Sequence, residues 1–176
     1  MNFHLANLGD VILLFQDEAL IKFHPALSRC WNKIGERKEV QTFDNHGKSA
    51  IFGSVNPFTG ELIHTYGNTI NQIFFLEHLN EVKQKYPGKT IIMVLDNCKS
   101  HFTKKVQKFL EANNNLFLLF LSPYSPDFNV IERLWQILRK AVTNNFLFQS
   151  LGEVKFASTK FLQFLSSDEV KKICAI

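Results

Sequence analysis

The hydrophobic residues of this chain follow two kinds of pattern, and the change between them lies near residue 68. Before it, short apolar runs alternate with turn-forming residues, which is typical of strands. The expected strands cover residues 11–18, 38–43, 48–55 and 61–66. After it, apolar residues recur at helical spacing as far as Tyr86, where the turn "PGK" ends a predicted helix.

The second half of the chain alternates apolar strands with helices. "TIIMVLDN" (90–97) and "LFLLFL" (116–121) are uninterrupted apolar runs, as expected for strands covered on both faces. The helix expected between them has an apolar side made of Phe102, Val106, Phe109 and Leu110. Another helix is predicted from Ile131, and a serine three residues before a glutamate gives a capping-box pattern for a last helix at 151–164. Strands first and β-α-β alternation later predict an α/β fold with a mixed central sheet flanked by helices, the element order of a ribonuclease H-like fold.

Composition is consistent with one domain over residues 1–176. The chain is 45% hydrophobic with 18 Phe, and only 20% of its residues are charged, which argues against disorder. Cys30, Cys98 and Cys174 form no CxxC pair, which favours a reducing compartment and gives no zinc motif. The apolar runs are too short to span a bilayer. We therefore expect a soluble cytoplasmic protein without a membrane partner, nucleoid-associated if bacterial, and its net charge of +4 is compatible with a phosphate-bearing partner.

Three acidic residues lie at the ends of strongly apolar elements. Asp17 is expected at the end of the first strand, Asp96 at the end of the central strand, and Glu132 directly after Ile131 at the start of a helix. Active sites collect at the carboxyl ends of strands in sheet-centred folds. Three carboxylates in one place repel one another, and a divalent cation removes that penalty. Two such ions roughly 4 Å apart could activate an attacking oxygen and stabilise a leaving oxygen on a phosphodiester.

Each of these acids also has a local explanation. Asp17 and Glu18 could form a solvated strand end, and Asp96 could cap a turn or the following helix. Glu132 follows Asn129 by three residues, which is a capping-box pattern. Taken singly, none of the three acids establishes a catalytic site.

Three stretches of sequence carry a more specific likeness. "LLFQDE" (13–18), "VLDNCKSH" (94–101) and "LSPYSPDFNVIERLW" (121–135) resemble the catalytic domain of mariner-superfamily transposases, in particular those of related bacterial insertion sequences. The likeness extends from about residue 10 to 148, and the 35 residues between Asp96 and Glu132 agree with the family spacing to within a residue or so. The resemblance implies a ribonuclease H-like fold in which Asp17, Asp96 and Glu132 are the catalytic and metal-binding DDE triad, with two Mg²⁺ or Mn²⁺ ions.

The resemblance also implies a reaction and partners. The reaction is hydrolysis at transposon ends, after which the freed 3′-hydroxyl attacks target DNA, typically at a TA dinucleotide. The partners are DNA and a second copy of the chain in a homodimer. The residues expected near DNA are Asn97, Lys99, His101, Arg139 and Lys140. For Asn97 and His101, orientation of a carboxylate and a simple turn or helix-start role remain alternatives.

One departure from the family concerns the N-terminus. These transposases carry helix-turn-helix modules before the catalytic domain, whereas here the first predicted strand begins near residue 11. The chain is therefore expected to be the second frame of a split element, a truncated remnant or an isolated domain. In each case, recognition of the element's ends would be lost or supplied by a separate or frameshift-fused helix-turn-helix polypeptide.

The sequence also bears on three alternative functions. A catalytically silent, truncated transposase would act as a dimerisation or regulatory partner, although all three acids are intact. A nucleotide-binding module is disfavoured because no Gly-rich phosphate loop follows any predicted strand. A nuclease that cuts RNA–DNA hybrids would share the acids and differ in its substrate.

Overall fold

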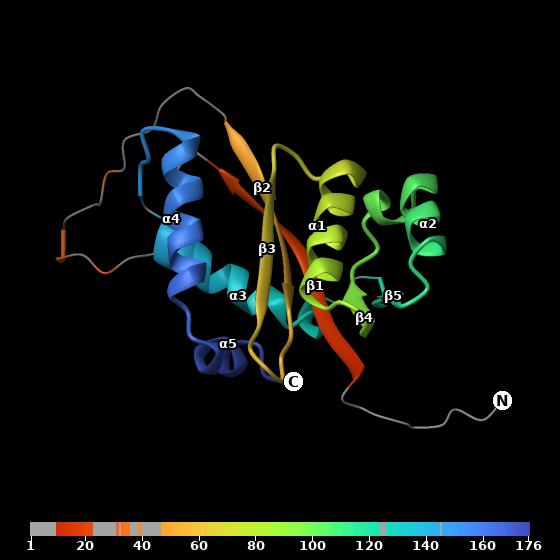
Figure 1. The fold of residues 1–176 in the computed structure, drawn as a ribbon. Coiled ribbons are helices and arrows are strands. Elements are labelled where there is room, and N and C mark those ends of the chain that lie inside the picture. The colour runs from red at the N-terminus through yellow and green to blue at the C-terminus, as the bar shows by residue number, and fades with distance from the viewer. Residues whose placement is uncertain are drawn as a thin grey trace.

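The protein is built on one mixed sheet. The structure, a computed structural model, describes residues 10–22, 31, 33–35, 39, 47–123, 126–144 and 146–176. Five strands pair in the order β3-β2-β1-β4-β5, and the sheet runs through the middle of the molecule (Figure 1). The strands are β1 (Val11–Lys22), β2 (Lys48–Val55), β3 (Leu62–Gly67), β4 (Thr90–Leu95) and β5 (Leu116–Phe120).

The first three strands are antiparallel, and the last two are parallel to β1. This arrangement confirms the predicted mixed sheet. The first strand is longer than expected, because Ala19 and Ile21 continue its buried alternation and it stays paired to β2 as far as Lys22. The prediction that Asp17 ends this strand is therefore wrong. The strand predicted over residues 38–43 falls almost entirely outside the described residues.

In the described part of the chain, five α-helices connect and cover the strands. They are α1 (Gln72–Lys85), α2 (Lys104–Glu111), α3 (Ile131–Leu138), α4 (Leu151–Phe164) and α5 (Ser167–Ile173). Shorter helical turns are η2 (Lys99–Phe102), η3 (Pro126–Phe128) and the π-helical η4 (Arg139–Thr143). The last predicted helix is confirmed as α4, whereas α5 was not expected. No helix in the described ranges is long and apolar enough to cross a bilayer.

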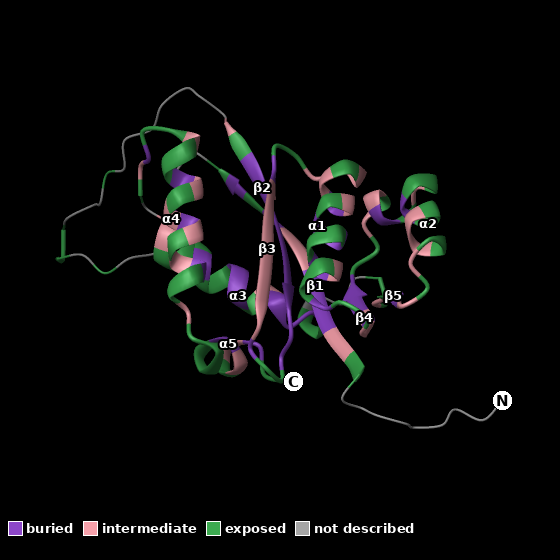
Figure 2. Ribbon diagram, in the orientation of Figure 1, coloured by how far each residue is buried: buried purple, intermediate pink, exposed green. Residues whose placement is uncertain are grey.

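Each face of the sheet has its own apolar core. α3, α4 and α5 cover one face, and α1 and α2 lie against the other (Figure 1), so that purple, buried positions line the inner sides of the helices (Figure 2). Alternate residues of a strand point to opposite faces. Accordingly, Phe15 and Ala19 of β1 belong to the core under α3, and Leu14 belongs to the core under α1. The side chains of Asp17 and Glu18 therefore leave β1 on opposite faces.

Candidate active site

Asp17 lies on the α3 face of β1, next to the point where β4 ends. Its partner across β2 is Gly53, and the last paired residues of β1 and β4 are Phe15 and Val94. A Cβ at Gly53 would come within 2.5 Å of the Trp135 ring, so the absence of a side chain there allows α3 to approach the sheet closely. Asp17 thus lies beside α3, in a part of β1 that is no longer paired with β4.

Asp96 is the first residue after β4 and is held by its own loop. Its Oδ1 accepts a hydrogen bond from the Cys98 amide at 3.0 Å. The next side chain, Asn97, donates from Nδ2 to the carbonyl of Leu121 at 2.6 Å and so ties this loop to the end of β5. Asp96 and Asn97 therefore do form the turn that was the alternative explanation for them. The Asp96 side chain is exposed in this turn.

Glu132 stands in the first turn of α3, with the apolar residues Ile131, Leu134 and Trp135 buried beneath it. The predicted capping box with Asn129 is wrong. The Asn129 backbone carbonyl accepts the Glu132 amide, and its side-chain Nδ2 donates to the carbonyl of Gln16 at 2.8 Å. Asn129 thus fastens the start of α3 to the β1 residue that precedes Asp17.

The charges of Asp96 and Glu132 both act on Asp17. Burial raises the pKa of Asp17 from 3.8 to about 8; the charge of Glu18 adds to the rise, as do those of Glu132 and Asp96, while a hydrogen bond with the Glu18 backbone opposes it. Burial also raises the pKa of Glu132, where Arg139 opposes the rise and Asp96 adds to it. Asp17, Asp96 and Glu132, which lie far apart in the sequence, are therefore near enough for the charges of Asp96 and Glu132 to raise the pKa of Asp17.

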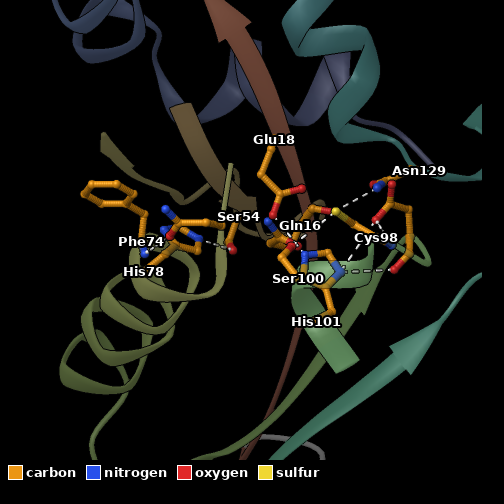
Figure 3. A network of polar contacts seen from close by, with 11 residues as sticks. Gln16, Glu18, Ser54, Phe74, His78, Cys98, Ser100, His101 and Asn129 are labelled. Atoms are coloured by element: carbon orange, nitrogen blue, oxygen red, sulfur yellow. Dashed lines mark hydrogen bonds and ion pairs between the residues drawn. The ribbon is translucent and has the colours of Figure 1, made fainter. Parts of the chain in front are cut away.

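The sequence alone offers Glu18 only as part of a solvated strand end. In the structure, Glu18 is buried instead. Its side chain is 4% exposed, and its Oε1 lies 2.9 Å from His101 Nε2, while the His101 side chain is fully buried (Figure 3). Burial lowers the pKa of His101, but the hydrogen bond and charge of Glu18 outweigh it, so the pKa is raised. The apolar residues after Glu18 are the signal that could have revealed a strand continuing past it.

Two overlapping groups of ligand atoms could hold a divalent cation. One is the expected triad of Asp17, Asp96 and Glu132, whose burial and like charges a cation would offset, although the ligand atoms that lie within 4.8 Å of one another belong to a different set of residues. The other consists of Glu18, Asp96 and His101, whose ligand atoms all lie within 4.8 Å of one another. The set made of three carboxylates suits the hard cations Mg²⁺ and Mn²⁺, which prefer oxygen ligands.

The residues expected near DNA fall into two classes. Lys99, Arg139 and Lys140 are exposed, and Arg139 is close enough to Glu132 to lower its pKa. His101 is buried beneath the surface and bonded to Glu18, which fits the orienting alternative better than a phosphate contact. Asn97 is exposed, but its amide is engaged with Leu121.

Comparison with known proteins shows the family of this chain. Residues 12–155 match the family described as DDE superfamily endonuclease. The chain is 28% identical over 155 residues to the insertion element IS630 uncharacterized 39 kDa protein of Shigella sonnei, a match that covers 88% of this chain and 45% of that protein. It is also 32% identical over 108 residues to the uncharacterized protein y4pE/y4sA of Sinorhizobium fredii (strain NBRC 101917 / NGR234), covering 59% of this chain and 75% of that protein. The chain thus spans less than half the length of the insertion-element protein.

Similar solved structures include the Mos1 transposase paired-end complex with left transposon end, at a TM-score of 0.70 and 20% identity over 92% of this chain and 50% of that chain. The catalytic domain of Mos1 mariner transposase gives a TM-score of 0.65 at 17% identity, covering 92% of this chain and 74% of that chain. These likenesses confirm the ribonuclease H-like fold. Since the family match extends over most of the sequence, including all three acids, the chain belongs to the DDE superfamily endonuclease family.

Proposed function

We propose that this chain is the catalytic domain of a transposase that cuts DNA at transposon ends and joins the freed end to target DNA, using Asp17, Asp96 and Glu132 to hold a divalent cation. The observation that carries the proposal is the match of residues 12–155, which include all three acids, to the DDE superfamily endonuclease family. The charges of Asp96 and Glu132 both raise the pKa of Asp17, although the three residues come from β1, the end of β4 and the start of α3.

The two chemical steps are alike. In the first, a water oxygen attacks a phosphorus atom of DNA, the bond from phosphorus to the 3′-oxygen breaks, and that oxygen takes up a proton. In the second, the new 3′-hydroxyl loses its proton and attacks a phosphorus of the target strand, again displacing a 3′-oxygen. A divalent cation bound by the carboxylates supplies Lewis-acid polarisation of the phosphate and stabilises the leaving oxygen.

The chain's own residues would divide the remaining work. Asp17 and Glu132, both partly buried on the α3 face, would form the fixed part of the site, and the exposed Asp96 would complete it from the β4 end. Arg139 and Lys140, together with Lys99, would contact phosphates on either side of the acids, which is how basic side chains position DNA.

Similar solved structures support the partner assignments. They include Mos1 paired-end complexes with a transposon end, with Mn and with Mg. We accordingly propose Mg²⁺ or Mn²⁺ as the cofactor, two ions in all, and a dimer acting on two ends. We further propose that a helix-turn-helix segment, fused or separate, recognises those ends.

A nicking assay tests the proposed function. The chain is incubated with supercoiled plasmid and Mn²⁺, and relaxed product is measured by gel. Asp96→Asn and Glu132→Gln should each lower nicking by about 100-fold or more, because each removes a negative ligand of the cation. Glu81→Gln, an exposed acid on α1, is the matched control and should retain the wild-type rate.

Wild-type nicking no greater than that of the two variants would contradict catalysis by this chain. That outcome would favour the silent, regulatory alternative instead.

A further inference from the structure

Glu18 and His101 form a buried pair directly behind the candidate active site. Glu18 lies on the α1 face of β1, opposite Asp17, and its Oε1 is 2.9 Å from His101 Nε2. Both side chains are almost completely excluded from solvent. A carboxylate in such a place is costly unless it is paired, so the two residues depend on each other.

The second ring nitrogen of His101 faces Asp96. Nδ1 lies 3.2 Å from the Asp96 carbonyl oxygen and 3.6 Å from its carboxylate Oδ1. Both ring nitrogens therefore already have oxygen partners within the protein, which leaves neither of them free for a metal ion. His101 is thus suited to act through Asp96 and not as a ligand itself.

The surroundings hold the ring in one place. His101 belongs to η2, and its ring packs on Phe75 of α1 with centroids 4.2 Å apart. Asp96, by contrast, follows the last strand residue of β4, beyond the strand pairing that joins β4 to β1. Within the described residues, the fixed contacts of Asp96 are the Cys98 amide and the His101 ring.

We propose that Glu18 and His101 are positioning residues that fix the Asp96 loop against β1 and thereby set the distance between Asp96 and Asp17. The proposal rests on the proposed function, in which Asp17, Asp96 and Glu132 hold a divalent cation. The pair joins the strand that carries the first acid to the loop that carries the second. Its loss would widen the site without removing a ligand.

The test is the affinity of the full chain for Mn²⁺, measured by the EPR signal of the free ion. The variants are His101→Gln, Glu18→Gln and the double variant. Each should bind Mn²⁺ about 10–100-fold more weakly than the wild type, the usual effect of removing a residue that supports a metal ligand. The matched control is His78→Gln, because His78 is also fully buried, with its ring nitrogens hydrogen-bonded to Ser54 (Figure 3) and to Thr65. Within the described residues, no hydrogen bond or ion pair joins His78 to the three acids.

The double variant keeps the experiment decisive if a single variant fails to fold, since it replaces both members of the buried pair by amides of similar side-chain volume. If the double variant binds Mn²⁺ as tightly as the wild type while Asp17→Asn loses binding, the positioning role is overturned and the proposed function stands. An electron spin-echo signal from ¹⁴N coupled to Mn²⁺ in the wild type would also overturn it, because the imidazole would then be a ligand. Undiminished binding in Asp17→Asn would overturn the proposed function.

Discussion

Asp17 is the residue at which stability and the proposed chemistry conflict. Its carboxyl is partly buried and close to three other carboxylates, so in the absence of a cation its pKa rises from 3.8 to about 8. The folded chain therefore resists ionisation of this group, whereas the unfolded chain ionises it freely. A bound divalent cation would reverse the balance by making the ionised form favourable.

Replacing this acid should stabilise the protein in the absence of metal. In EDTA at pH 7.5, we expect Asp17→Asn to raise the free energy of unfolding by at least about 1 kcal/mol, or roughly 3 °C in Tm, because the neutral amide removes the repulsion and the cost of burying a charge. Addition of Mg²⁺ should raise the Tm of the wild type but leave that of the variant unchanged. A variant less stable than the wild type in EDTA would contradict this account of the site.

His78 gives a pH dependence of the opposite kind, away from the site. Burial lowers its pKa from 6.5 to about 3, so the folded protein keeps the ring neutral while the unfolded chain binds a proton below pH 6.5. Its contribution to stability is full above pH 6.5 and is lost as the pH falls towards 3, by up to about 1.4 kcal/mol per pH unit. Urea unfolding at pH 7, 6 and 5 should show a shallower loss for His78→Gln than for the wild type. Equal slopes would show that this ring does not control the acid sensitivity.

At the scale of elements, the position of α3 decides where Glu132 lies. Two features set that position: the Asn129 amide bonded to β1, and the close packing of Trp135 over Gly53 of β2. Neither of these two contacts could be predicted from the sequence. Asn129 has the spacing of a capping residue, and local pattern favours that role, but the long-range bond to Gln16 replaces it.

A methyl group at Gly53 should therefore move α3. We expect Gly53→Ala to lower the free energy of unfolding by about 1–3 kcal/mol, since its Cβ would overlap the buried Trp135 ring. Nicking should fall as well, because the displaced helix carries Glu132. Gly152→Ala in α4 is the control: its Cβ would meet only Ser150 Oγ at 3.6 Å, so stability should hold. Equal effects of the two changes in chemical denaturation would exclude the packing argument.

At the scale of the whole molecule, much of the architecture follows from local pattern. The apolar runs predict the parallel strands β4 and β5, and the period change near residue 68 predicts α1, because these signals depend on burial that neighbouring residues share. The likeness of three sequence stretches to one family is the reason for proposing the three acids as the site. What local pattern cannot supply is the partner across the sheet: Glu18 was missed because its counterpart, His101, lies 83 residues away.

The central claim is that three distant carboxylates form one cation site, and a crystal soaked in Mn²⁺ tests it most directly. Anomalous scattering should show a peak between the carboxylates of Asp17 and Asp96, with Glu132 facing the same ion. A peak bound by Glu18 and His101 in place of Asp17 would contradict the claim, as would a saturating soak that leaves the three carboxylates without metal.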